Sequence, residues 1–188
     1  WSKYLALMFG STIQAQTVVL AVFMGGLALG NRIFGGRADR TRHPLALYGY
    51  LEVSIGLYAF FFSTIYKFAD TVFVKVGSGL LEKTALLLAL KGVISMALLL
   101  GPTILMGGTL PVLAAWLQRS SVDAGRRSAR FYSTNSLGAV CGAGLAGFFL
   151  VVWLGLPVTL QMTALANVLI GFTAIGIARW QGDQLATS

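Results

Sequence analysis

The chain has 188 residues, of which 56% are hydrophobic and only 11% are charged. A soluble globular domain has roughly 25% charged residues, and the mean hydropathy of +0.78 also excludes an ordinary soluble domain. Several apolar runs reach about 20 residues, which is the length a helix needs to cross a bilayer core of roughly 30 Å. Because these runs are continuous rather than alternating, they favour helices over a membrane β-barrel.

The formal net charge is +8, with nine arginines and five lysines. In a soluble protein this excess would indicate nucleic-acid binding. In a helical membrane protein, positive charge is expected on cytoplasmic loops, where it fixes the orientation. The sequence therefore predicts the lipid bilayer as a partner and no nucleic acid. The single cysteine, Cys141, allows neither an intramolecular disulfide nor a cysteine-rich metal site.

The first full span is expected at residues 12–34. The apolar segment before it, residues 1–9, would be about 13 Å long as a helix, which is too short to cross, so we expect the end of an earlier helix there. The span opens with Gln14 and Gln16, whose side chains must face protein or water rather than lipid. The small pair Gly26 and Gly30 then allows two helix backbones to approach closely.

A basic segment, residues 30–44, follows this span and carries four arginines and the only histidine. We expect it to be a loop in water beside the membrane. Pro44 ends the segment and suits the first turn of the next helix, so the second span is expected at residues 45–66.

Glu52 is the notable residue of the second span, because it would lie about 12 Å inside the start of that helix. A carboxylate at that depth is costly unless it is paired or hydrated, which makes Glu52 a candidate binding residue. The alternative is a structural anchor paired with Arg32, Arg130 or Asn135. The sequence leaves both interpretations open.

The middle of the chain contains a polar stretch and a long apolar one. Residues 67–83 have mixed charge and are expected to form a loop. Residues 84–91 are expected to form an interfacial helix and residues 92–117 a span kinked at Pro102 and Pro111. Spans interrupted by glycine and proline are typical of transporter binding sites, although they also serve packing.

Two further spans are expected after a second basic loop at residues 118–130. The fourth, residues 131–154, has Asn135 near its start and then small residues at steps of about four, which give one helix face without bulk. A turn at residues 155–157 leads into the fifth span, residues 158–178, which carries Gln161 and Asn167. Residues 181–188 read as a cytoplasmic tail or linker.

The arginines and the lysines fall on different sides of the predicted membrane. If all five spans cross, every arginine lies on or near one side and every lysine lies toward the other. The arginine side, with the end of the chain, is then predicted to be cytoplasmic. The chain is expected to be a multi-pass protein of a plasma membrane.

Soluble-type active-site motifs are absent from the sequence. It has no glycine-rich phosphate loop with its lysine and no acids or histidines at metal-ligand spacing. His43, in the first basic loop, is the only possible imidazole ligand. We therefore expect no catalytic residue, no metal and no cofactor in this chain.

The first basic loop resembles the loop between the second and third helices of major facilitator transporters. The match is carried by Gly35, Asp39 and Arg40, while Arg42 stands where that family has a second glycine. The resemblance implies that Asp39 bonds a neighbouring helix N-terminus and that arginines clamp adjacent helix ends.

A broader resemblance, over nearly the whole chain, is to the membrane portion of bacterial fused spermidine synthase-like proteins. It is carried by five blocks: WSKYLALMFGST (1–12), VLAVFMGGLALG (19–30), LEVSIGLY (51–58), GPTILMGGTLP (101–111) and FYSTNSLGA (131–139). It implies a bundle like half of a major facilitator fold, in a bacterial inner membrane, joined to a cytosolic aminopropyltransferase-like domain. No residue of this chain matches that catalytic domain.

Three functions remain open at this point. The chain can be the membrane domain that anchors or serves such an enzyme, or a structural subunit of a larger membrane complex. It can also be half of a transporter for a small polar or cationic solute such as a polyamine. The polar lining would then come from these residues: Gln14, Gln16, Glu52, Asn135, Gln161 and Asn167.

Overall fold

The structure, a computed structural model, describes residues 13–80, 84–119 and 124–186, and every regular element in these ranges is helical. The elements in chain order are α2 (Ile13–Arg40), α3 (Pro44–Gly77), the 3-10 turn η1 (Ser78–Leu80), α4 (Thr84–Arg119), α5 (Ala124–Gly144), the π-helical segment η2 (Leu145–Leu150) and α6 (Val151–Ala186). Four helical stretches in the described residues are long and apolar enough to cross a membrane. The all-α prediction is confirmed for the described residues, and the four apolar stretches suggest a membrane protein.

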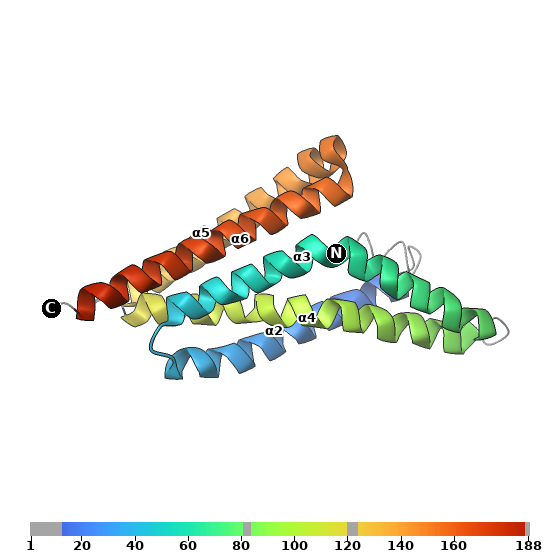
Figure 1. Cartoon of the computed structure of the whole chain (residues 1–188), viewed down its shortest axis with the longest axis horizontal. Coiled ribbons are helices and arrows are strands. Elements are labelled where there is room, and N and C mark those ends of the chain that lie inside the picture. The colour runs from blue at the N-terminus through green and yellow to red at the C-terminus, as the bar shows by residue number, and fades with distance from the viewer. Residues whose placement is uncertain (1–12, 81–83, 120–123, 187–188) are drawn as a thin grey trace.

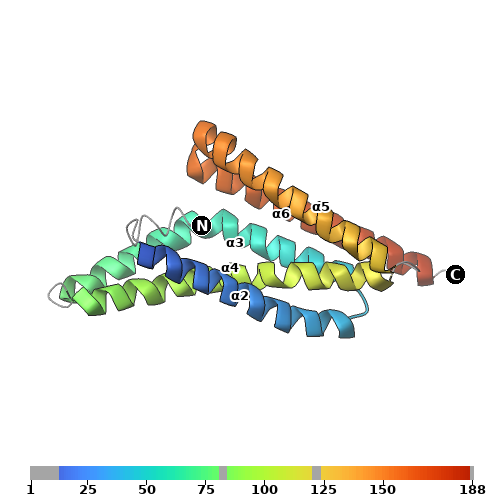
Figure 2. The same ribbon diagram turned by 180° about the vertical axis from the view of Figure 1, so that it is seen from behind.

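The last of these four stretches, residues 129–181, contains a reversal at Gly155. The backbone of Gly155 has φ 77° and ψ 166°, a conformation that side-chain-bearing residues rarely adopt. Pro157 follows in the first turn of the returning helix. Figures 1 and 2 show α5 and α6 as the two arms of a hairpin that closes here, where the sequence predicted a turn.

The helices pack as two pairs that share one further contact. Helix α2 lies along α4, and α3 lies along α6, while α3 and α4 join the two pairs (Figure 1). Helix α5 stands at the outside and, among the described elements, contacts the end of α4 and the segment η2. Every residue of α5 from Tyr132 to Ala143 is exposed.

Glycines set the close approach of α2 to α4. A Cβ at Gly30 would collide with the carbonyl oxygen of Ile104, and one at Gly26 would collide with the Thr103 side chain. In return, Gly107 of α4 lies against the backbone of Leu27. Membrane helices lack a hydrophobic drive toward one another, so such backbone contact supplies the van der Waals packing that holds them. The close approach predicted for Gly26 and Gly30 is present.

The helices α3 and α6 also approach each other closely at glycines. A Cβ at Gly49 would lie 2.6 Å from the carbonyl oxygen of Gly171, and one at Gly56 would lie 2.7 Å from that of Ala164. The contact between α3 and α4 is different in kind. It consists of apolar side chains around the fully buried Val112, together with a hydrogen bond from the Tyr58 hydroxyl to the Leu98 carbonyl at 2.7 Å.

Three expected loops are largely helical, and the loop expected at residues 118–130 is helical wherever the structure describes it. Helix α2 continues to Arg40, so the glycines of the first basic segment are helical and only residues 41–43 form the turn. Helix α3 continues beyond residue 66 as far as Gly77. Charged side chains indicate that a helix has left the bilayer, whereas ending the helix needs a residue such as glycine or proline. The sequence between Tyr66 and Gly77 has neither.

Helix α4 runs without interruption from Thr84 to Arg119, with Pro102 and Pro111 inside it. The expected interfacial helix at residues 84–91 is therefore continuous with the span that follows. The expected end of an earlier helix at residues 1–9 lies outside the described residues.

Candidate functional site: a polar pocket between α3, α4 and α5

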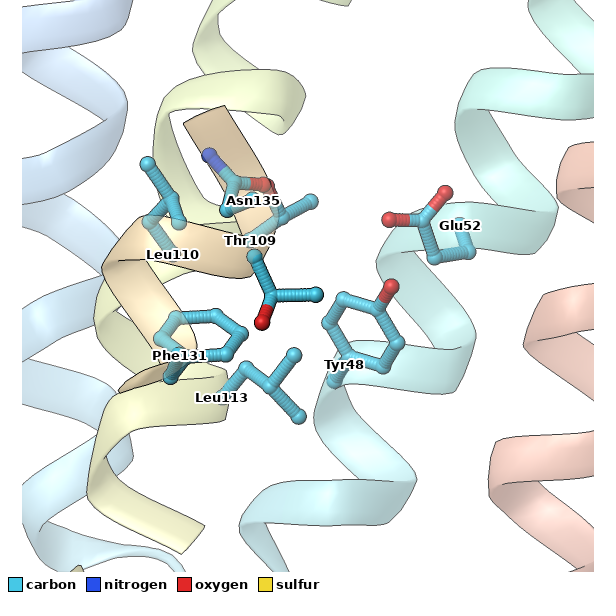
Figure 3. Close-up of a pocket in the computed structure, with 8 residues that line it drawn as sticks. Tyr48, Glu52, Thr109, Leu110, Leu113, Phe131 and Asn135 are labelled. Carbon is cyan, nitrogen blue, oxygen red and sulfur yellow. The ribbon is translucent and has the colours of Figure 1, made fainter. Parts of the chain in front are cut away.

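A pocket of about 230 Å³ lies where α3, α4 and the start of α5 meet. Glu52 and Asn135, both predicted as candidate binding residues, line it from opposite sides (Figure 3). It lies close to the end of the bundle that carries the arginines, because each helix contributes residues near that end. The lining comprises Tyr48, Glu52, Thr109, Leu110, Leu113, Phe131, Thr134 and Asn135.

The charged wall of the pocket comes from α3. Glu52 and Tyr48 are four residues apart and therefore lie on one face of the helix, one above the other. The Tyr48 hydroxyl donates a hydrogen bond to the Glu52 carboxylate, and both side chains are half-buried. In Figure 3 the tyrosine hydroxyl lies directly beneath the carboxylate. This bond holds the carboxylate in place, and no ion pair to Glu52 is present among the described residues.

The facing wall comes from α4 and α5 and is neutral. Thr109 donates its hydroxyl hydrogen to the Met106 carbonyl at 2.8 Å, which leaves the hydroxyl oxygen free to accept. Thr134 and Asn135 are exposed, and so they open the pocket toward the outside of the bundle. Phe131 contributes an aromatic ring, which also attracts cations. The pocket therefore combines one carboxylate, neutral acceptors and an aromatic surface.

The arginine anchors considered for Glu52 do not hold it. Among the residues that the structure describes, no ion pair joins Glu52 to Arg32 or Arg130, and both arginines are exposed. The bond to Tyr48 takes the place of the expected partner. Asn135 shares the pocket with Glu52 but comes from another helix.

The remaining polar candidates do not converge on this pocket. Gln161 is exposed and Asn167 is half-buried, both on α6, and neither lines the pocket. Gln14 and Gln16 belong to the first turns of α2, and their side chains lie outside those that the structure describes. The polar lining expected from six residues is thus reduced to Glu52 and Asn135.

The sequence did not predict the other lining residues, among them Tyr48, Thr109, Phe131 and Thr134. Tyr48 could have been found, because it lies four residues before Glu52 and therefore on the same helix face. Thr109 and Phe131 had no such signal. Their place in the pocket depends on how α4 and α5 meet α3, which the periodicity of single helices does not encode.

An arginine from the neighbouring helix α4 clamps the end of α2. Arg119, the last residue of α4, donates hydrogen bonds to the carbonyls of Thr41, Asp39 and Ala38 at 2.6, 2.7 and 3.0 Å. The last carbonyls of a helix have no partner within it, so a guanidinium satisfies them and favours the dipole. Asp39 enters this arrangement through its backbone carbonyl, while its side chain is exposed.

The arginines of the first basic segment are themselves exposed. Arg37 lies over the ring of Phe34, 5.5 Å from its centroid. A Cβ added at Gly35 would lie in ordinary van der Waals contact with the Pro111 side chain, 3.7 Å away. Arg40 and Arg42 are exposed. The segment is therefore tied to the bundle by Arg119 rather than by its own charges.

The chain was compared with families, curated proteins and solved structures. No family model, curated protein or solved structure matches it. Within the described ranges, no three histidine, cysteine, aspartate or glutamate side chains gather as a metal-ligand group. The chemistry of the pocket is that of a single carboxylate beside a tyrosine hydroxyl.

Proposed function

We propose that this chain is a membrane domain whose α3–α4–α5 pocket binds a small cationic or polar solute, such as a polyamine. The observation that carries the proposal is the half-buried carboxylate of Glu52, which faces the pocket with no described arginine or lysine beside it. An unpaired carboxylate inside a membrane is costly, and a cationic solute would neutralise it. The aromatic rings of Tyr48 and Phe131 favour the same kind of ligand.

The position of the pocket favours transport of that solute. The two helix pairs are each held by backbone contact at glycines, whereas the α3–α4 contact beside the pocket is made by side chains. Rigid pairs that rock about such a contact would open the pocket to one side and then the other, as in transporters built from rocking bundles. We propose that the chain is half of such a transporter, similar to half of a major facilitator fold.

The proposed membrane placement has five spans, with α5 and α6 crossing separately on either side of Gly155. The arginine-rich turns and the end of α6 would be cytoplasmic, in the inner membrane of a bacterium, because basic residues concentrate on that side. Support comes from the arginine positions. The turn after α2, the start of α5 and the end of α6 all lie at one end of the bundle (Figures 1 and 2).

A second candidate function is to anchor or serve a cytosolic aminopropyltransferase-like domain, as the spermidine synthase-like blocks suggested. The observation that favours it is the end of α6, which lies at the arginine end of the bundle. A domain that followed α6 would then be on the cytoplasmic side. A third candidate, a structural subunit of a membrane complex, is favoured by the exposed faces of α5.

Uptake of labelled spermidine into vesicles tests the transport proposal. We expect uptake above that of protein-free vesicles and its loss in Glu52→Gln, which keeps the shape of the side chain but removes the charge. Asp70→Asn is the matched control, because Asp70 is an exposed acid of the same helix that lies outside the pocket. Uptake no greater than in empty vesicles would exclude transport of this solute.

The two other candidates have separate tests. The full coding sequence decides the anchoring function, since that function requires an aminopropyltransferase-like domain downstream. Native mass measurement of gently solubilised protein decides the subunit function, which requires partner chains and would be excluded by a lone monomer.

A further inference from the structure

Exposed arginines gather at one end of the bundle. They lie on the last turns of α2, on the turn after it, on the first turns of α5 and near the end of α6, and these segments lie together in both views (Figures 1 and 2). Asp39 is the only acid among the side chains that the structure describes at this end. The exposed set, called here the arginine end, comprises Arg32, Arg37, Arg40, Arg42, Arg126, Arg130 and Arg179.

Among the side chains that the structure describes, most of this charge has no acidic partner. Arg119 is occupied by the carbonyls at the end of α2, and Arg37 lies over the ring of Phe34. Arg126 and Arg130 are four residues apart on one face of α5 and repel each other. The first turn of α5 contains no acid, and the positive end of a helix does not favour arginines. Helix stability therefore does not explain why arginines occupy these positions.

The charge borders an apolar surface. On α6, Ile177 and Trp180 are exposed on either side of Arg179 along the chain, by 43% and 64%. On α5, Leu137 is exposed by 64%, two turns beyond Arg130. A purely polar polyanion would satisfy the arginines and leave these side chains in water. An amphiphile with an anionic head would satisfy both surfaces.

We propose that the arginine end binds the phosphate headgroups of anionic phospholipids, with Arg126, Arg130 and Arg179 as the principal contacts. Guanidinium groups pair with phosphate oxygens through two parallel hydrogen bonds. The acyl chains would then lie along the apolar sides of α5 and α6, with Trp180 at the headgroup level. Clusters of basic residues beside membrane helices attract anionic lipid in this way.

The test is lipid selectivity of the full chain in nanodiscs made from equal phosphatidylglycerol and phosphatidylcholine. We expect the wild-type protein to enrich phosphatidylglycerol among its retained lipids. Arg126→Gln with Arg130→Gln should reduce that enrichment roughly fivefold per arginine removed. The matched control is Lys67→Gln with Lys75→Gln, which removes the same charge from exposed residues on the last turns of α3. The control should keep the enrichment.

Equal retention of both lipids by the wild-type protein would overturn the proposal, and so would equal losses in the arginine and lysine variants. If the double arginine variant fails to fold, Arg179→Gln provides a second test with the same expected direction. Inorganic phosphate at millimolar concentration should not displace the lipid. Full displacement by phosphate would show that the site binds the anion without the acyl chains. That result would also overturn the lipid assignment.

Discussion

Helices α2 and α5 both carry glycines four residues apart, but only those of α2 have neighbours. On α2, Gly26 and Gly30 lie so close to α4 that a single added carbon would collide with it. On α5, Gly138 and Gly142 have nothing within 4 Å of where a Cβ would be. The smooth face of α2 is used to hold two helices together, whereas that of α5 makes no contact in the described chain.

The difference between these two glycine pairs shows which contacts hold the bundle together. The pairs α2–α4 and α3–α6 are each fixed by glycines that admit a neighbouring backbone. Helix α5 instead touches the bundle near its first turns, and those turns supply Phe131, Thr134 and Asn135 to the pocket. Substitutions on the two kinds of helix should therefore differ strongly in their effect on stability.

The largest effect is expected for Gly30→Val. The added side chain would collide with the backbone of Ile104, and backbone cannot move aside without separating the helices. Overpacking of this kind costs about 3 kcal/mol or more in the free energy of unfolding. Thermal unfolding of the purified protein in detergent measures it, and a melting temperature equal to that of the wild type would refute the close contact of α2 with α4.

A smaller loss is expected for Gly49→Ala, which tests the second pair. Its methyl group would lie 2.6 Å from the Gly171 carbonyl oxygen and 2.7 Å from the Ile175 side chain. Because only one carbon is added, part of the strain can be relieved, and we expect a cost of about 2 kcal/mol. Gly176→Ala is the control on α6, since nothing lies within 4 Å of that position. Equal stability of the two variants would contradict the α3–α6 contact.

Arg119→Gln tests the clamp that ties α4 to the end of α2. The substitution removes hydrogen bonds to three carbonyls, but the site is close to water, so we expect a loss of about 1 kcal/mol. Arg32→Gln, at an exposed position on α2, should be neutral by comparison. Hydrogen exchange of the amides near residues 38–41 should also become faster in the Arg119 variant alone. Unchanged exchange there would argue against the clamp.

The smallest effect is expected for Gly142→Val, which is the counterpart of Gly30→Val on α5. The added side chain meets open space, and substitutions at such positions usually change stability by less than about 0.5 kcal/mol. The same melting experiment measures it. A loss as large as that of Gly30→Val would show that the face of α5 is covered in the folded protein, and the comparison between the two helices would fail.

The sequence predicted where the helices lie along the chain better than it predicted which helices contact one another. Apolar runs of sufficient length predict spans because the bilayer thickness fixes how many residues must be apolar. The glycine spacing predicts a smooth helix face, but it is the same on α2 and α5 and does not tell which face finds a partner. The predicted helix ends are wrong at residues 35–40, 67–77 and 124–130, because charge marks where a helix leaves the bilayer and not where the helix ends.

The candidate site was predicted only in part. Glu52 and Asn135 were found because polar groups within apolar runs are rare and costly. Their convergence, and the contributions of Tyr48 and Thr109, depend on the angles between α3, α4 and α5. Those angles follow from packing between helices, which no single stretch of sequence encodes.

The most direct test of the account is equilibrium binding of labelled spermidine to the purified chain in nanodiscs. Wild type and Asp70→Asn should bind it saturably with equal affinity. Glu52→Gln should weaken binding roughly tenfold, because it removes the one carboxylate found among the described lining residues. Binding of equal affinity in all three proteins would contradict the assignment of this pocket as a cation site.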